Sequence, residues 1–221
     1  MLLLAIASIL FFLCTYSIGF YSKLLLEKIW QIKIEAGLVD VFLLGLVISF
    51  IYFNVLSFFV PLNEWVLIPF AFTSLFFLWS ERQFLTQITQ ALQFLKSPTA
   101  FIIFIPLFAI LFFYWIGPSM NLDSRNYHIL SIKWYYNYSV IPGLANIHGR
   151  FAFNPASFVL AAPYSFETVL QQAIYPINGV VVVLFSLWWF KRVCLQIQFA
   201  TAVILFIAGC FIERQLFVNV S

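Results

Sequence analysis

Residues 41–63, VFLLGLVISFIYFNVLSFFVPLN, form an uncharged run between Asp40 and Glu64. A helix needs about 20 consecutive apolar residues to cross a bilayer, so this run is long enough to do so. The rest of the chain has the same character, because 64% of its 221 residues are hydrophobic and 9% are charged. Soluble domains contain roughly 25% charged residues. The sequence therefore predicts an all-α membrane protein.

Further uncharged runs flank this one on both sides. They cover residues 1–22, 65–80, 97–122, 168–190 and 193–212. Together, the runs predict about six transmembrane helices. A weaker apolar piece, residues 151–166, contains Pro155 and Pro163, and it adds a seventh crossing only if it spans the bilayer instead of lying in the interface. The chain, residues 1–221, is thus predicted to be a single multi-pass membrane domain.

The first run differs from a signal peptide. It lacks a basic n-region, and no convincing cleavage site precedes the next charged residue. Its apolar part is also longer than the apolar region of a signal peptide. We therefore expect residues 1–22 to be a retained membrane helix.

Two segments between the runs have the pattern of helices that lie on a membrane surface. Residues 22–37 place leucines and isoleucines at helical spacing among lysines, and residues 81–96 place Phe84, Ile88 and Leu95 opposite glutamines and threonines. An apolar face opposite a polar face is typical of interfacial helices. We expect both segments to connect membrane spans along the surface.

The distribution of lysines and arginines predicts the orientation, because loops rich in these residues stay on the cytoplasmic side. An extracytoplasmic N-terminus puts most of them in cytoplasmic loops and fewer outside. The cytoplasmic loops then contain Lys23, Lys28, Lys33, Arg82, Lys96, Lys191 and Arg192, and the outer segments contain Arg125, Lys133, Arg150 and Arg214. This orientation puts the loop formed by residues 119–158 on the extracytoplasmic side.

That loop contains the longest polar segment, residues 120–158, MNLDSRNYHILSIKWYYNYSVIPGLANIHGRFAFNPASF. Charge is costly in a membrane protein, so a cluster of charged residues is a candidate functional site. Helical spacing predicts an aromatic surface helix over residues 124–138, with Asp123 at its N-terminus. Gly143 and Gly149 favour tight turns or close backbone approach after it. The candidate site residues are Asp123, Arg125, His128, Lys133, His148 and Arg150.

Each candidate also has a structural interpretation. Asp123 fits a helix cap and a catalytic carboxylate equally well. Arg150 has a forked donor suited to phosphate, and Lys133 has a point charge. Surface arginines, lysines and histidines of this kind more often face solvent or lipid headgroups, and this interpretation applies to Arg125, His128 and Lys133 in particular.

The motif Asp123…Tyr127-His128…Lys133-Trp134…Pro142-Gly143-Leu144…Asn146…His148-Gly149-Arg150…Phe153-Asn154 resembles the D…YH…KW…PGL.N.HGR..FN signature of a family of bacterial multi-pass membrane proteins of unassigned function. An outward loop that opens with an aspartate before an aromatic surface helix is also similar to the GT-C superfamily. Members of that superfamily are polytopic glycosyltransferases that use polyprenyl-phosphate sugars. The motif covers residues 123–158, and the rest of the chain is similar only in hydropathy.

The resemblance implies transfer of a sugar from a polyprenyl-phosphate donor to an extracytoplasmic acceptor at the bacterial cytoplasmic membrane. Asp123 would remove the proton from the acceptor hydroxyl. Positively charged and hydrogen-bonding groups would bind the donor phosphate; the candidates are Arg150, His148, Lys133, His128 and Arg125. Many GT-C loops carry paired acids, whereas Asp123 is followed by Ser124, so we expect a site without a metal or other cofactor. Most members have further spans, which implies that this chain is the N-terminal part of a longer protein.

Other classes of function stay open. A polysaccharide flippase or solute transporter would place polar groups on broken helices near the bilayer midplane, whereas these runs are uncharged and contain only modest breaks such as Pro106 and Pro176. A non-catalytic integral membrane protein is a further alternative. The basic residues form no concentrated patch, which argues against a nucleic-acid partner. Cys14, Cys194 and Cys210 lie in or beside apolar runs, so they predict buried thiols and no disulfide framework or zinc site.

Overall fold

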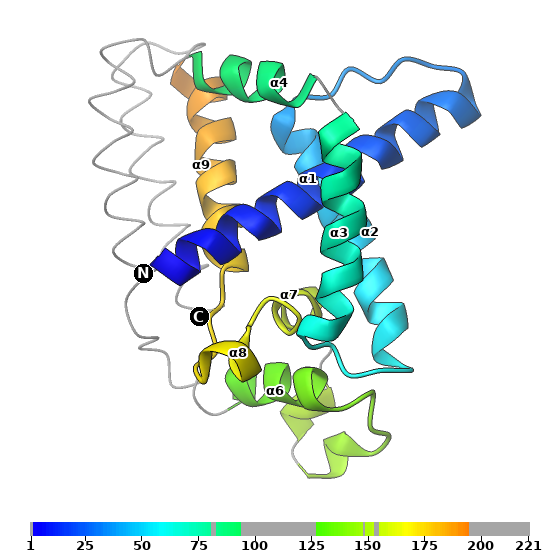
Figure 1. The fold of residues 1–221 in the computed structure, drawn as a ribbon, viewed down its shortest axis with the longest axis vertical. Coiled ribbons are helices and arrows are strands. Elements are labelled where there is room, and N and C mark those ends of the chain that lie inside the picture. The colour runs from blue at the N-terminus through cyan, green and yellow to red at the C-terminus, as the bar shows by residue number, and fades with distance from the viewer. Residues whose placement is uncertain (1, 81–82, 94–126, 148, 153–154, 195–221) are drawn as a thin grey trace.

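The computed structural model describes residues 2–80, 83–93, 127–147, 149–152 and 155–194, and within these ranges all regular structure is helical (Figure 1). The all-α class predicted from the sequence is confirmed for this part of the chain. The predicted crossing over residues 97–122 lies outside the described residues, and so does the one over residues 193–212 beyond Cys194.

The fold begins with two long apolar helices, α1 (Leu2–Trp30) and α2 (Leu38–Ser57). Both are long and apolar enough to cross a membrane. They cross at two glycines: a Cβ atom on Gly19 would lie 1.9 Å from the carbonyl oxygen of Val41, and one on Gly45 would lie 1.8 Å from that of Thr15. The backbones therefore touch, as they do where small residues line the contact between membrane helices.

The prediction of a separate surface helix over residues 22–37 is wrong. α1 continues without a break to Trp30, and residues 31–37 form a non-helical linker. The polar residues extend α1 by about two turns, with Lys23 and Glu27 paired at 3.5 Å across one turn. Helical spacing alone did not distinguish a new helix from the polar end of an existing one.

α3 (Glu64–Ser80) runs beside α1, and α4 (Gln83–Leu92) follows it. Ser17 of α1 donates a hydrogen bond to the carbonyl of Ser74 at 2.6 Å. The amphipathic helix predicted over residues 81–96 is present as α4. Its Phe84 and Ile88 pack against the core, as the apolar spacing predicted.

The loop of residues 119–158, called the polar loop below, and the segment after it fold into short helices in their described parts. They are α6 (Ile129–Asn137), the 3-10 helices η3 (Leu144–Asn146) and η4 (Gly149–Ala152), α7 (Ala156–Ala161) and α8 (Glu167–Leu170). Figure 1 shows α6, α7 and α8 at the end of the α2–α3 pair where the turn formed by residues 58–63 lies. With six residues, α7 is too short to cross a bilayer, so the described part of residues 151–166 contains no helix that could form a seventh crossing.

The fifth predicted crossing is shorter in the structure than its uncharged run. The run begins at residue 168, whereas the last described helix, α9 (Ile177–Cys194), begins directly after Pro176. The residue before a proline avoids helical backbone angles. Gln171 adopts a left-handed conformation at φ 57°, which also interrupts the segment.

The helices enclose an aromatic core and expose apolar outer faces. Phe11, Phe42, Phe53 and Tyr164 are fully buried between α1, α2 and the segment after α7. The exposed apolar residues recur at helical spacing. They are Leu43, Val47, Ile51 and Val55 on α2, with Tyr52 beside Ile51, and Trp65, Ile68, Phe72, Phe76 and Trp79 on α3, with Leu75 beside Phe76.

Candidate functional site

The structure describes only some of the predicted site residues. Asp123, Arg125 and His148 lie outside the described residues, and Arg150 is described only as part of the η4 backbone. His128 and Lys133 are described with their side chains.

His128 is buried next to α7 and does not line the cavity of the polar loop. It is 8% exposed, and its ring centroid lies 5.1 Å from that of Phe158 and 4.2 Å from that of Tyr127. It begins the helical turn that leads into α6. This placement packs α6 against α7.

Lys133 forms an ion pair that connects α6 to α8. Its Nζ lies 2.6 Å from Oε1 of Glu167, and the two side chains are 43% and 26% exposed. A carboxylate of the protein thus already neutralises Lys133. A phosphate would have to compete with Glu167 for this charge.

A buried carboxylate lies next to this ion pair, at the first residue of α3. Both oxygens of Glu64 lie within hydrogen-bond distance of the Tyr136 hydroxyl, at 2.7 and 2.6 Å. The backbone N–H of Thr168 donates to the Tyr136 hydroxyl oxygen at 2.8 Å. Burial raises the pKa of the Tyr136 hydroxyl, and its hydrogen bond to Glu64 acts in the same direction. The tyrosine therefore stays a neutral donor at ordinary pH.

Backbone hydrogen bonds join the polar loop to the α2–α3 turn on both sides of this contact. The N–H of Leu62 donates to the carbonyl of Tyr135 at 2.7 Å, and the N–H of Val140 donates to the carbonyl of Ser57 at 2.8 Å. The N-terminus of a helix favours negative charge, so Glu64 is well placed in the first turn of α3. Together these bonds hold α6 across the ends of α2 and α3.

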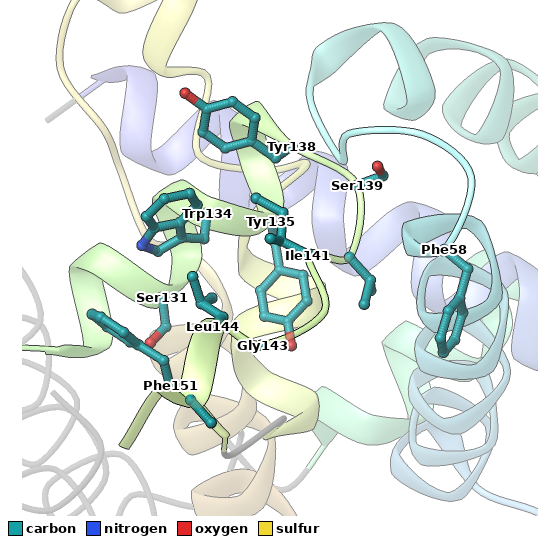
Figure 2. A pocket seen from close by; sticks show the side chains of 12 residues that line it. Phe58, Ser131, Trp134, Tyr135, Tyr138, Ser139, Ile141, Gly143, Leu144 and Phe151 are labelled. Carbon is teal, nitrogen blue, oxygen red and sulfur yellow. The ribbon is translucent and has the colours of Figure 1, made fainter. Parts of the chain in front are cut away.

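A cavity of about 260 Å³ opens beside α6. Figure 2 shows its lining side chains, which come from α6, from the segment that follows it, from Phe58 at the end of α2 and from Phe151 of η4. Most of the walls are aromatic or aliphatic, with hydroxyls from Ser131 and Ser139. The cavity is smaller than typical small-molecule sites, which measure roughly 300–1,000 Å³.

Separate parts of the sequence motif meet at this cavity. Trp134, Gly143 and Leu144 of the motif line it together with Phe151, which follows Arg150. Gly143 has φ 84°, a left-handed conformation that favours glycine, as predicted for the turn after α6. Gly149 does not need to be glycine for space, because a Cβ atom there would meet nothing within 4 Å.

Sequence reasoning did not identify Glu64 and Glu167 as parts of this region. Glu64 is the single acidic residue in residues 41–80, and an acidic residue between two apolar runs is a signal for an interior or functional position. The pairing of Glu167 with Lys133 has no such local signal. Among the described residues, no group of three His, Cys, Asp or Glu residues could hold a metal ion.

The chain belongs to the family described as "Domain of unknown function (DUF8201)", whose family model matches residues 1–220. Comparisons with curated proteins and with solved structures gave no match. The family description assigns no activity.

Proposed function

We propose that this DUF8201 chain is a GT-C-like glycosyltransferase of the bacterial cytoplasmic membrane, which transfers a sugar from a polyprenyl-phosphate donor to an extracytoplasmic acceptor. The observation that carries this proposal is that three motif residues, Trp134, Gly143 and Leu144, line one cavity. Lys133 directly precedes Trp134, and Arg150 directly precedes Phe151, which also lines the cavity.

The apolar outer faces support a multi-pass membrane location. Soluble proteins rarely expose large continuous apolar patches, yet Val47 and Ile51 on α2 are 54% and 50% exposed, and Phe72 on α3 is 74% exposed. Lipid would cover such faces at no cost. Two of the described helices are long and apolar enough to cross the bilayer, and the further predicted spans would complete the bundle.

The arrangement of the helix ends supports an extracytoplasmic polar loop. The α2–α3 turn and the polar-loop helices lie at one end of the α2–α3 pair, and the linker of residues 31–37 lies with α4 at the opposite end (Figure 1). The linker and the last turns of α1 contain Lys23, Lys28 and Lys33. Because basic segments stay on the cytoplasmic side, the polar loop would face outward.

The proposed reaction is a displacement at the anomeric carbon of the donor sugar. Asp123 takes the proton of the acceptor hydroxyl, and the acceptor oxygen forms the new glycosidic bond. The bond between the anomeric carbon and the phosphate oxygen breaks, and polyprenyl phosphate leaves with the electron pair. Arg150, His148 and Arg125 are the candidates to offset the phosphate charge, while Lys133 would first have to exchange Glu167 for phosphate.

The experiment compares Asp123→Asn with the wild-type chain in membranes that receive radiolabelled polyprenyl-phosphate hexoses. Released polyprenyl phosphate is measured, because this product forms whichever acceptor is used. Loss of the base should reduce its formation by about 10²- to 10⁴-fold. Glu35→Gln is the matched control, because Glu35 is exposed in the linker at the opposite end of the bundle, and it should retain full activity.

Wild-type activity in the Asp123→Asn variant would exclude the assigned base. Solute uptake into proteoliposomes without any sugar transfer would instead favour a flippase or carrier. Membrane levels of each variant should be measured in parallel, so that a loss of insertion is not mistaken for a loss of chemistry.

A further inference from the structure

We infer that residues 165–174, called the latch loop below, are held on α6 by the ion pair between Lys133 and Glu167, and that a ligand phosphate which takes Lys133 opens the loop. The inference rests on the proposed function for the identity of this ligand, the polyprenyl-phosphate donor. The latch itself follows from the closed base of the loop, its two hinge residues and its two attachments to α6.

The latch loop is closed at its base. The backbone N–H of Ile174 donates to the carbonyl of Ser165 at 3.0 Å, so the two ends of the loop lie side by side. Ser165 is buried, and Phe166 next to it packs against the core. Compact surface loops whose ends meet are frequently functional. A fixed base lets the rest of such a loop turn about a few hinge residues.

The backbone conformation marks the hinge residues. Phe166 has φ 51° and Gln171 has φ 57°, and these two residues lie on either side of α8. Among the described residues, Gln31 is the one further non-glycine residue with a positive φ. Non-glycine residues adopt this conformation rarely, and it persists only where surrounding contacts hold it. The position of α8 therefore depends on contacts outside the helix.

Two side chains of α6 provide these contacts. The Nζ of Lys133 lies 2.6 Å from Oε1 of Glu167, and the Tyr136 hydroxyl accepts the backbone N–H of Thr168 at 2.8 Å. Figure 1 shows α8 beside α6. Adjacent residues of the latch loop are thus attached to two residues one turn apart on the same helix.

The latch loop buries little beyond its base. Val169 is 69% exposed, and Thr168, Gln171 and Gln172 are exposed as well. Segments with few buried apolar contacts open at a low cost in free energy, without unfolding the rest of the protein. The two attachments to α6 therefore decide whether the loop stays closed.

Glu167 occupies the group that a ligand phosphate would bind. Carboxylates and phosphates accept the same charge-assisted hydrogen bonds from an ammonium group, and the Lys133 side chain is 43% exposed, so a ligand can reach it. A phosphate monoester carries about 1.5–2 negative charges at pH 7 and competes well against one carboxylate. An exposed ion pair contributes little stability, so a ligand can break it. The loop then keeps one attachment, at Tyr136.

The test measures hydrogen exchange of single amides in the full chain, held in phosphatidylcholine nanodiscs. Glu167→Gln should raise the exchange rate of the Thr168 amide about twofold to fivefold, because the ion pair no longer holds the loop closed. The Ile174 amide at the base should exchange as in the wild-type chain. The charge-swapped double variant, Lys133→Glu with Glu167→Lys, should restore slow exchange at Thr168.

Glu27→Gln is the matched control. It breaks the ion pair between Lys23 and Glu27, which lies within α1, and it should leave the exchange of the Thr168 amide unchanged. The variant therefore separates release of the latch loop from the general effect of losing an ion pair.

A pair of ligands tests the effect of phosphate. Farnesyl phosphate and farnesol differ only in the phosphate group. Farnesyl phosphate should speed exchange of the Thr168 amide in the wild-type chain, whereas farnesol should not. In Glu167→Gln the loop is already released, so farnesyl phosphate should add little.

Three results would overturn the inference. Wild-type exchange at Thr168 in Glu167→Gln would show that the ion pair does not hold the loop. Equal acceleration at Thr168 and Ile174 would show that the segment unfolds instead of turning about its base. Equal effects of farnesol and farnesyl phosphate would show that phosphate does not compete for Lys133. Because exchange needs no turnover, opening by farnesyl phosphate in a chain without transferase activity would leave the latch standing while the proposed reaction fails.

Discussion

Removal of the buried hydroxyl should cost more stability at Tyr136 than at Tyr175, because only the Tyr136 hydroxyl has a carboxylate partner, Glu64. In Tyr136→Phe, the buried Glu64 carboxylate loses its donor, which should lower the free energy of unfolding by about 1–3 kcal/mol. The Tyr175 hydroxyl is buried without a hydrogen-bond partner among the described residues, so Tyr175→Phe should be neutral or slightly stabilising. Thermal unfolding of both variants in detergent checks this. Equal losses in the two variants would contradict the assigned hydrogen bond.

Tyr175 also predicts a loss of stability at alkaline pH. Burial, with a smaller effect from the charge of Glu167, raises the pKa of Tyr175 from 10.0 to about 12. The unfolded chain therefore releases this proton at a lower pH than the folded chain does. The stabilising effect is complete below pH 10 and is lost as the pH rises from 10 to about 12.

Melting temperatures measured between pH 9 and about 12 would test this titration. The wild-type chain should lose stability more steeply than Tyr175→Phe, because the variant has no group to titrate at this position. The other tyrosines are common to both proteins, so the difference between the two curves isolates Tyr175. Parallel curves would show that its hydroxyl titrates normally in the folded chain.

The sequence predicted which loop contains the candidate site, but not which residues its side chains contact. The polar composition of residues 120–158 identified the loop whose residues line the cavity. The partners of its charged residues were not predictable, because Lys133 pairs with Glu167 and Tyr136 with Glu64 across distant parts of the chain. No local sequence pattern indicates these two contacts, because they form only when α6 lies beside the first residues of α3 and α8.

The crossing of α1 and α2 predicts that Gly19 cannot be replaced by alanine. A Cβ atom would lie 1.9 Å from the carbonyl oxygen of Val41, so the helices would have to separate, at a cost of about 3 kcal/mol or more. Gly149→Ala is the matched control, because its Cβ would meet nothing within 4 Å. It should change stability by less than about 0.5 kcal/mol. Unfolding by SDS titration of both variants measures the difference, and a tolerated Gly19→Ala would contradict the close crossing.

The helices themselves were more predictable than their ends. Uncharged runs located α2 and α3, and amphipathic spacing located α4, because burial and lipid contact both select apolar side chains at helical spacing. The C-terminal end of α1 and the start of α9 were misplaced. The apolar content of the sequence did not show that α1 continues through polar residues to Trp30. It also did not show that α9 begins only at Ile177, directly after Pro176.

The composition of the whole chain predicted an all-helical class, which the described residues confirm. It could not predict that the short helices of the polar loop gather at the α2–α3 turn. That placement depends on hydrogen bonds such as Leu62 to Tyr135 and Val140 to Ser57, which join segments through backbone groups that every residue type carries. The position of the cavity follows from these bonds.

If the protein lies in a membrane, an arginine should have different effects on insertion at two exposed apolar positions. Val47 on the outer face of α2 is 54% exposed, and Ile147 in the polar loop is 70% exposed. If lipid covers α2, Val47→Arg places a charge in the hydrocarbon region, at a cost of about 2.5–3.5 kcal/mol for insertion. Ile147→Arg should be neutral, because the loop faces water or headgroups.

Alkaline carbonate extraction measures how much of each variant stays in the membrane pellet. Val47→Arg should shift protein out of the pellet and lower its abundance, while Ile147→Arg should match the wild-type chain. A water-facing α2 would accept an arginine at position 47 without this cost, so Val47→Arg would then be retained as well as Ile147→Arg. Equal retention of both variants would therefore mean that the outer face of α2 does not contact lipid, and that the two long helices do not cross a bilayer side by side.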